Sequence, residues 1–346
     1  MPHVGWPECR THLIQGGFPM KAFVRWGMIA GLLMALSVPA HAQVSKSGSA
    51  ATKFLTLDSS ARAAGLASSA TAYTDLGAFA ALTNQSTMVF VEGRGAVGVS
   101  YTKYFAEMTL FSAALVWNLG DNGAVGLGVH SLLSGDIPFT TSTDPTHQFD
   151  TAGQNFTVTD LAIGPSYARR LTDSFAVGGS VKFISEGTSG AGDVDRTSRA
   201  VAFDAGTIYT TDFRNFRIGA SFQNFGPDMQ FIDESNARDI LPTTFRIGFA
   251  GEPASLPVGS VMVSAELWKL REFDSVLNTG IEWWVNEYLA GRVGWKVGYS
   301  GGQDEGLSAG AGLRFSQGEL SLNIDYAYTQ FDLLDDLHRI SVGVGF

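Results

Sequence analysis

The chain has little of what most folds and active sites are built from. Its 346 residues include one cysteine, Cys9, so a disulfide within the chain is excluded. Charged residues make up 16%, against about 25% in ordinary globular domains. Beyond residue 42, no stretch reaches the roughly 18 consecutive apolar residues of a membrane-spanning helix. With 41 glycines and 45% hydrophobic residues, this composition favours an all-β protein, either a soluble sandwich or a membrane barrel.

Residues for catalysis and metal binding are equally scarce. Beyond residue 42 the chain has three histidines, His130, His147 and His338, which are too far apart to predict a metal site. Residues 298–302 match the G-x-S-x-G pattern of hydrolases, but at a strand end without the strand–turn–helix context that a nucleophile needs. The sequence has no phosphate-binding or dinucleotide-binding loop. We therefore expect neither an enzyme nor a cofactor.

Residues 20–42 have the organisation of a secretory signal peptide. Lys21 and Arg25 form a basic start, residues 27–38 are apolar, and residues 40–42 read Ala-His-Ala, a typical cleavage site. An N-terminal anchor helix is the alternative, although the apolar run is short for one.

This prediction makes residues 1–19 an upstream extension and Gln43 the first residue of the mature protein. Residues 43–346 carry 20 basic and 32 acidic residues, a net charge of −12. Since no basic stripe interrupts this acidic balance, nucleic acid is not an expected partner.

From residue 93 the chain alternates between apolar and polar residues, which places one set of side chains on each face of a strand. Fourteen such segments follow one another, an even number with lengths close to those that cross a bilayer. The predicted strands cover residues 93–104, 108–119, 123–135, 157–170, 174–186, 197–211, 215–225, 242–251, 258–269, 275–285, 288–299, 306–316, 319–330 and 338–346.

The lengths of the connections favour a transmembrane barrel over a sandwich. Long loops are predicted at 136–156, 187–196 and 226–241, and they alternate with tight turns such as Gly120–Gly123. Long loops at one end and short turns at the other are typical of bacterial outer-membrane barrels. We therefore predict a 14-stranded antiparallel barrel over residues 93–346, closed by pairing of the last strand with the first.

The polar face of the strands is expected to line the lumen. It carries charges of both signs, which either line a path or pair with one another and with an internal segment. Residues 43–92, rich in small side chains, are predicted to be that segment, a plug; a periplasmic tail is the alternative. We expect Val293 to face lipid and reject arginine, and its lumen-facing neighbour Gly294 to tolerate serine. Arg217 and Arg339 also lie between apolar neighbours on this face. The candidate plug and lumen contacts are Phe54, Leu55, Arg62, Phe79, Arg246, Arg292, Lys296, Arg314 and Asp325.

Several segments resemble the PorV/PorQ family of outer-membrane proteins, whose barrel is similar to that of the FadL fatty-acid transporters. The similarity spans most of residues 50–346 and includes "ATKFLTLDSSARAAGLASSATAYTD", "SFQNFGPDMQF" and "LSLNIDYAYTQFDLLDDLHRISVGVGF". The resemblance implies a 14-stranded barrel with an N-terminal plug. It also implies a C-terminal signal for the barrel-assembly machinery, here the alternating Ile340, Val342, Val344 and Phe346.

The chain departs from this family at one point. Family members usually carry an Asn-Pro-Ala-Gly element after the small-residue segment, and here residues 84–87 read Asn-Gln-Ser-Thr. The loss of proline and glycine puts the local turn in question.

Three functions follow as hypotheses. The resemblance suggests a component of type IX protein secretion that receives the C-terminal domain of exported cargo on its long outer loops. A FadL-like channel for hydrophobic small molecules is the second, with Phe54, Leu55 and Phe79 beside an apolar pocket. A soluble periplasmic β-protein is the third, which the closing strand and the loop asymmetry disfavour. Fold analogy alone does not choose between the first two.

Overall fold

The computed structural model describes residues 50–142, 149–190, 196–230, 238–253, 258–271, 275–297, 305–332 and 334–346. The chain separates into two units, Met1–Val44 and Ser45–Phe346, and the description below concerns the second. The predicted signal peptide, His147 and residues 298–302 lie outside the described residues. Within the described ranges, the search for a helix long and apolar enough to cross a membrane found none.

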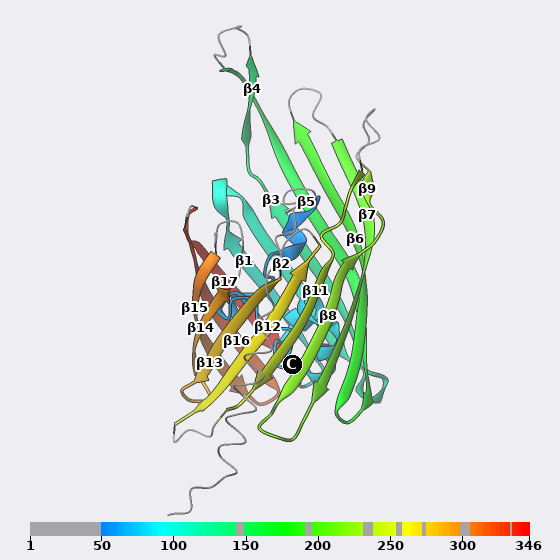
Figure 1. The fold of residues 1–346 in the computed structure, drawn as a ribbon, viewed down its shortest axis with the longest axis vertical. Helices are drawn as coiled ribbons and strands as arrows, with labels where there is room; N and C mark the ends of the chain where they lie inside the picture. The colour runs from blue at the N-terminus through cyan, green and yellow to red at the C-terminus, as the bar shows by residue number, and fades with distance from the viewer. Residues whose placement is uncertain are drawn as a thin grey trace, which may run out of the picture. The chain divides into compact units, whose positions relative to one another are not determined.

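Fourteen strands form one closed antiparallel sheet, as predicted. Its order is β1-β2-β3-β5-β6-β7-β8-β11-β12-β13-β14-β15-β16-β17, and β17 returns to pair with β1 (Figure 1). Each strand lies where the alternating pattern placed it, to within a few residues at most ends. The strands are β1 (Gly95–Lys103), β2 (Thr109–Asn118), β3 (Ala124–Leu133), β5 (Phe149–Thr172), β6 (Phe175–Gly190), β7 (Arg196–Thr210), β8 (Arg217–Phe225), β11 (Thr244–Gly251), β12 (Ser260–Leu270), β13 (Val276–Trp284), β14 (Leu289–Val297), β15 (Glu305–Gln317), β16 (Leu320–Phe331) and β17 (Leu337–Gly345).

The pairing of β1 with β17 closes the sheet. Its register runs from Ala96 opposite Gly345 to Lys103 opposite His338. Beyond the ladder, the Phe346 N–H donates to the Gly95 oxygen at 2.9 Å, and the Phe346 oxygen accepts from the N–H groups of Arg94 (2.6 Å) and Gly95 (2.9 Å). The last residue therefore completes the strand pairing.

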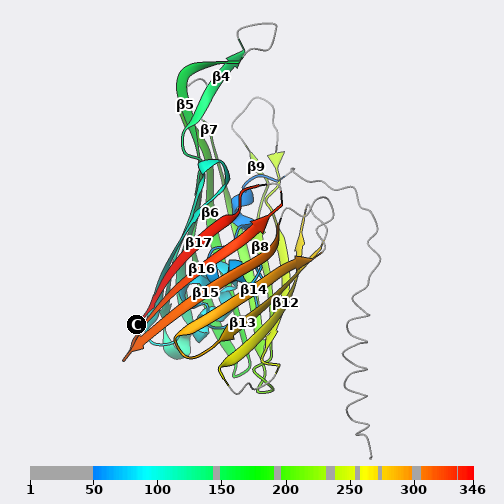
Figure 2. The same ribbon diagram turned by 90° about the vertical axis from the view of Figure 1, so that its left-hand side faces the viewer.

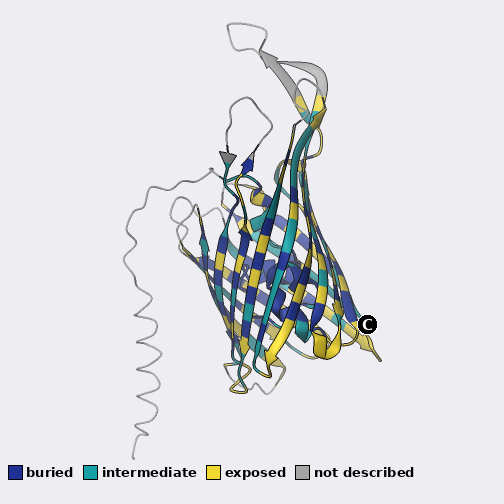
Figure 3. Cartoon of the chain, turned by 90° about the vertical axis from the view of Figure 1, so that its right-hand side faces the viewer, coloured by how far each residue is buried: buried dark blue, intermediate teal, exposed yellow. Residues whose placement is uncertain are grey.

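The barrel has two distinct ends. We call the end that carries Phe346 and short connections such as 119–123 the turn end, and the opposite end the loop end. Apolar side chains point outward between them: on β14, Leu289, Val293, Trp295 and Val297 are 42–47% exposed, whereas Arg292 and Lys296, facing inward, are 5% and 6% exposed. Figure 3 shows this alternation along the strands. An apolar outer face around a polar interior is the arrangement of a transmembrane barrel.

One connection differs from its prediction. Residues 137–142 and 149–156 are strands, because β4 (Ile137–Ser142) pairs with the first residues of β5 in a hairpin beyond the barrel rim (Figure 2). The hairpin makes β5 24 residues long, whereas β13 and β14 have nine each. Its phenylalanine, isoleucine and threonine residues favour an extended backbone, which the loop prediction overlooked. Residues 226–241 also contain a short pair, β9 (Met229–Gln230) with β10 (Arg238–Asp239).

Residues 50–92 form short helices that pack on inward-facing strand residues. The helix α2 (Ala61–Gly65) contacts β14–β17, and η3 (Gln85–Phe90) contacts β5–β7. Between them lie η2 (Gly77–Phe79) and α3 (Ala80–Thr83), and η1 (Lys53–Thr56) precedes them. Helices this short are unstable alone in water, so their conformation depends on contacts with the wall.

The exposed outer face predicts a depth-dependent cost of charge. We expect Val293→Arg to destabilise the folded protein by about 2–4 kcal/mol, because its neighbours place it in the middle of the apolar band. Leu320→Arg, close to the turn end, should cost only about 0–1 kcal/mol. Urea unfolding of both variants in lipid vesicles measures this difference, and equal costs would show that the outer face does not contact lipid.

The closing contacts of Phe346 predict a defect in assembly when it is deleted. Its ring lies 5.9 Å from that of Trp117 at the barrel rim, and its backbone makes the three hydrogen bonds to residues 94 and 95. We expect the deletion to lower the yield of folded barrel strongly, and Phe346→Tyr to preserve it, since an amphipathic ring suits an interface. Heat-modifiable gel migration of the membrane fraction measures the yield. Normal folded levels without Phe346 would refute this role.

Candidate functional site within the barrel lumen

Glycines on the inward face of the wall make room for residues 65–88. A Cβ atom at Gly206 would lie 2.1 Å from Asn84 Oδ1, and one at Gly178 would lie 2.6 Å from the backbone of Gln85. These distances are shorter than side-chain atoms tolerate, so only glycine permits the approach. Similar close approaches recur around the ring, at Gly98, Gly126, Gly128, Gly219, Gly280 and Gly294.

The same geometry corrects the expectation for Gly294. A Cβ there would lie 2.4 Å from the carbonyl carbon of Leu66 and 2.5 Å from the backbone nitrogen of Ala67. Serine at this position therefore collides with backbone, and the expectation that it would be tolerated is wrong. Face assignment alone could not reveal this, because the colliding chain lies more than two hundred positions away in sequence.

The turn at residues 84–87 forms without proline or glycine. Asn84 Oδ1 accepts hydrogen bonds from the Ser86 N–H (3.3 Å) and hydroxyl (2.7 Å), and Asn84 Nδ2 donates to the oxygens of Thr71 (2.9 Å) and Thr207 (3.2 Å). One asparagine side chain thus caps η3 and binds both the N-terminal segment and the wall. The replacement of Pro-Ala-Gly by Gln-Ser-Thr therefore leaves the hydrogen bonds of Asn84 in place.

A network of buried charges joins α2 to three strands. Arg62 donates to Glu282 on β13 at 2.7 and 2.8 Å and to Asp75 at 2.7 Å. Arg292 on β14 donates to the same Glu282 at 2.5 Å and to Asp325 on β16 at 2.6 Å. Arg62, Glu282 and Arg292 have side chains no more than 7% exposed. Removing one member of such a network destabilises the fold, because it leaves a buried charge without its partner.

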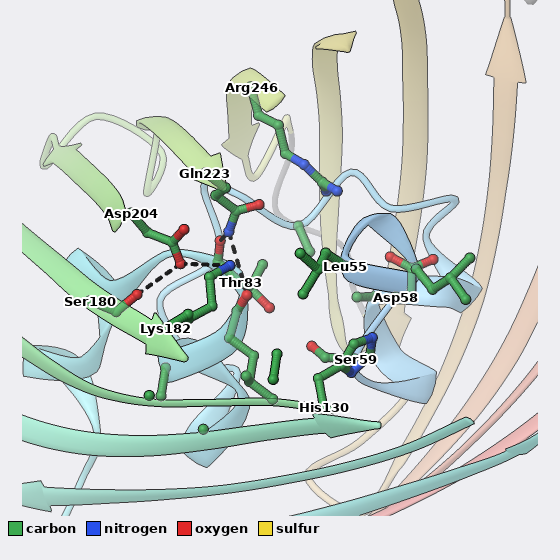
Figure 4. A pocket seen from close by; sticks show the side chains of 18 of the residues that line it. Leu55, Asp58, Ser59, Thr83, His130, Ser180, Lys182, Asp204, Gln223 and Arg246 are labelled. Carbon is green, nitrogen blue, oxygen red and sulfur yellow. Dashed lines mark hydrogen bonds and ion pairs between the residues drawn. The ribbon is translucent and has the colours of Figure 1, made fainter. Parts of the chain in front are cut away.

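A small inner cavity of about 50 Å³ lies between part of the N-terminal segment and the wall (Figure 4). On its wall side Lys182 lies 3.0 Å from Asp204, which also accepts from the Ser180 hydroxyl at 2.8 Å. Gln223 donates to the Thr83 oxygen at 2.7 Å. These polar groups satisfy one another, and the space left is that of one or two water molecules.

His130 lies at the edge of the same cavity. Its Nδ1 bonds the Ser112 hydroxyl at 2.7 Å, its Nε2 bonds the Phe54 oxygen at 2.9 Å, and its ring stacks on that of Phe54. Both ring nitrogens are used by neighbours, so this histidine holds η1 against β3. Among the described residues, no group of three His, Cys, Asp or Glu side chains is placed to bind a metal ion.

A larger cavity of about 390 Å³ lies at the loop end, and we call it the upper cavity. Leu57, Asp58 and Ser68 separate it from the inner cavity, because these three residues line both. Its lining is mostly apolar and aromatic, with four cationic side chains. It includes Lys53, Phe54, Tyr104, Phe105, Leu132, Pro242, Trp268, Leu270, Arg271, Lys296, Phe331, Leu334, Leu337 and Arg339.

Asp336, in the connection beside this cavity, accepts two hydrogen bonds. The Tyr328 hydroxyl donates to Asp336 at 2.5 Å, and the Phe331 N–H donates to it at 3.1 Å. Both bonds favour the charged carboxylate, and the larger effect, from Tyr328, holds the pKa of Asp336 below its ordinary value.

The structure brings most of the candidate lumen residues to one of these places. Phe54, Lys296 and Arg339 line the upper cavity, Leu55 and Arg246 line the inner one, and Phe79 packs on Gly98 of β1. Arg62, Arg292 and Asp325 form the buried network, and Arg314 lies at its edge, 3.8 Å from Asp75. Ile340 is 52% exposed on the outer face, and Phe346 completes the closing pair.

Other functional positions were missed by sequence reasoning. Glu282 and Glu266 complete buried charge pairs with Arg62 and Arg246, and the exposed Asp75 also pairs with Arg62. Trp268 stacks under Arg246 at 4.3 Å. Glu282 and Glu266 alternate with apolar neighbours within their strands, a signal that could have marked them as inward-facing.

Solved structures with the same architecture are membrane channels. The chain superimposes on the CymD monoaromatic hydrocarbon channel with a TM-score of 0.57 at 13% identity, covering 86% of this chain and 99% of that one. For the toluene transporter TbuX of Ralstonia pickettii the TM-score is 0.58 at 13% identity, with 83% and 98% covered. A FadL homologue of Pseudomonas aeruginosa gives 0.54 at 13%, also with 83% and 98% covered. None of the curated proteins compared matches the chain.

The closed ring of fourteen strands with an apolar outer face is that of the FadL-like barrels of the outer membrane. Within that class the sequence is more specific: the family model of the type IX secretion system protein PorV matches residues 40–271. The chain belongs to the PorV family, and the resemblance drawn from its sequence is confirmed. Both this family and the structural neighbours are secretion or transport barrels.

The buried network predicts unequal roles for two arginines. We expect Arg62→Met to destabilise the protein by about 3–5 kcal/mol, because it leaves the buried Glu282 with one partner fewer. Arg314→Met should cost less than about 1 kcal/mol, since Arg314 is 34% exposed and lies 3.8 Å from Asp75. Urea titration followed by tryptophan fluorescence measures both. Equal effects would mean that Arg62 does not join the segment to the wall.

Proposed function

We propose that this protein is an outer-membrane receptor for cargo of type IX secretion. The loop end faces the outside of the cell and the turn end the periplasm, as connection lengths in such barrels predict. The apolar outer face contacts lipid, and Phe346 ends the segment that the barrel-assembly machinery reads. The chain divides into an upstream extension (1–19), a signal peptide (20–42), a plug (43–92) and the barrel (93–346).

Residues 50–92 support the role of a plug because they combine close packing with buried charge pairs. Arg62 and Asn84 each bond the wall from inside, and wall glycines admit the backbone at 66–72 and 84–85. Passage of a polypeptide would require most of these contacts to break. The proposed barrel therefore presents cargo at its outer surface and does not conduct it.

The observation that carries the proposal, together with the family match, is the uneven rim. β5 is 24 residues long and β6 is 16, which at about 3.3 Å per residue carries both well beyond the roughly 30 Å hydrocarbon core. The hairpin of β4 and β5 is a built projection on the side where cargo would arrive. Its paired strands give it a defined form before any partner binds.

A second candidate function is a channel for hydrophobic small molecules, favoured by the apolar lining of the upper cavity. Two structural neighbours are named for monoaromatic hydrocarbon or toluene passage, although at 13% identity they show only the fold. The inner cavity of about 50 Å³ is too small for such a solute. This function would therefore need the plug to move, whereas cargo reception does not.

Removal of the projecting hairpin tests the proposal. We replace residues 138–155 by a Gly-Ser turn and follow secretion of a reporter fused to a C-terminal sorting domain of the native host. We expect cargo in the medium to fall to background while heat-modifiable migration shows normal levels of folded barrel. The matched control replaces Gly120–Asn122 at the turn end by Gly-Ser-Gly. Undiminished secretion without the hairpin would overturn cargo reception on this rim.

A further inference from the structure

A groove of about 330 Å³ is open to the outer face of the barrel at its turn end, and we call it the outer groove. It lies where the connection between β7 and β8, residues 211–216, meets the ends of β11 and β12. The residues that line it differ from those that line the two lumen cavities and from those of the buried charge network. The outer groove is therefore separate from the site in the lumen.

Two small residues on the outer face leave the space for this groove. Phe249 on β11 is opposite Ala265 on β12, and Gly251 is opposite Val263, so a large and a small residue face each other in both pairs. Phe249 and Val263 are each 40% exposed, and the ring of Phe216 stacks on that of Phe249 at 6.3 Å. The floor of the outer groove is therefore apolar, with an aromatic wall on one side.

A tight turn at the rim holds one positive and one negative side chain beside this floor. Arg214 and Asn215 have left-handed backbone conformations, with φ values of 50° and 52°. The Glu252 N–H donates to the Arg214 oxygen at 2.9 Å, and Asn215 Nδ2 donates to the Glu252 carboxylate at 3.0 Å. These bonds join the turn to the end of β11, so Arg214 and Glu252 are neighbours at the rim.

Arg214 offers hydrogen-bond donors to a ligand in the outer groove. Its Nη1 donates to the Pro253 oxygen at 2.5 Å, and its guanidinium lies 5.8 Å from the centre of the Phe213 ring, which is 71% exposed. The other N–H groups of this exposed arginine have no acceptor in the part of the chain that the structure describes. A guanidinium fixed at one nitrogen and open at the others suits a phosphate group.

The polar and apolar parts of the outer groove lie at different depths. Arg214 and Glu252 are at the rim, whereas Ala265 is five residues into β12, about 17 Å along the strand. On an outer face that contacts lipid, the rim is at the level of the headgroups and the floor is in the hydrocarbon. A phospholipid has its charged and its apolar parts in the same order.

We propose that the outer groove binds one molecule of phosphatidylethanolamine from the periplasmic leaflet, an inference that rests on the lipid contact and the orientation given under the proposed function. The lipid phosphate accepts hydrogen bonds from the Arg214 guanidinium, and the ethanolamine ammonium donates to the Glu252 carboxylate. One acyl chain lies along the floor, over Gly251 and Ala265. A ligand with one charge of each sign matches a rim with one charge of each sign.

The charges at the rim favour this lipid over two other phospholipids. Phosphatidylglycerol has no ammonium group and brings a net negative charge toward Glu252 and the neighbouring Asp212. Phosphatidylcholine keeps the positive charge, but its quaternary nitrogen has no N–H to donate to a carboxylate. These two lipids are therefore the comparison ligands in the test.

The test measures the binding of single lipid molecules to the delipidated mature barrel by native mass spectrometry. The probes are the dioleoyl forms of the three lipids, each titrated separately. We expect the first phosphatidylethanolamine to bind about fivefold more tightly than the first molecule of either other lipid. Arg214→Gln should weaken that binding about tenfold, because it removes a charged donor. Ala265→Leu should weaken it as well, because the larger side chain fills the floor.

Arg169→Gln is the matched control, because Arg169 is an exposed cation near the same end of the barrel, on β5, and does not line the outer groove. It should leave all three affinities unchanged. Heat-modifiable migration confirms that each variant is folded.

Two results would overturn the inference. The first is equal binding of the three lipids to the unaltered barrel, or equal binding of phosphatidylethanolamine to this barrel and to Arg214→Gln. The second is a dimer of the barrel that Ala265→Leu separates, since a second copy of the chain would then occupy the outer groove.

The outcomes also separate this inference from the proposed function. If loss of the hairpin abolishes secretion but the lipid preference is missing, the rim at the loop end receives cargo and the outer groove is no lipid site. If the preference is present and depends on Arg214 but secretion survives loss of the hairpin, the lipid site stands and cargo reception fails.

Discussion

Closure of the sheet is the constraint on which the remaining structure depends. In hydrocarbon, every backbone N–H and C=O must find a partner within the protein, and a ring of strands satisfies this only if the last strand pairs with the first. The β1–β17 ladder and the hydrogen bonds of Phe346 with residues 94 and 95 supply that pairing. Once the ring is closed, each strand has one face toward the lumen and one toward the outside. The alternation of residues then places polar side chains inside and apolar side chains outside.

The inside of the ring then creates a second requirement, since polar side chains facing a narrow lumen need partners. Arg62 and Asn84 from the N-terminal segment bond charged and carbonyl groups of the wall, so segment and wall satisfy each other. Glycines replace side chains where the segment approaches most closely. The abundance of glycine thus reflects the packing of the lumen as much as the need for turns.

The two ends of the barrel differ in structure. The turn end is compact and carries the chain terminus that completes the sheet. The loop end carries the β4–β5 hairpin and a cavity with a mostly apolar and aromatic lining. A receptor that leaves its cargo outside needs such a surface and has no need of an open lumen. A FadL-like fold is therefore compatible with membership of a secretion family. One fold can serve different functions, which depend on the residues at its functional surface.

The strands, their faces and the family can be predicted from the sequence. A period of two is written locally, so the fourteen segments and the outward position of Val293 could be predicted residue by residue. Which residues contact one another across the lumen depends on the tertiary structure. Arg62 bonds Glu282, and Gly294 packs against the Leu66 backbone. Both contacts form only because barrel closure brings distant strands around one short segment. The pairing of β4 with β5 and the upper cavity also depend on contacts between strands, which no local pattern encodes.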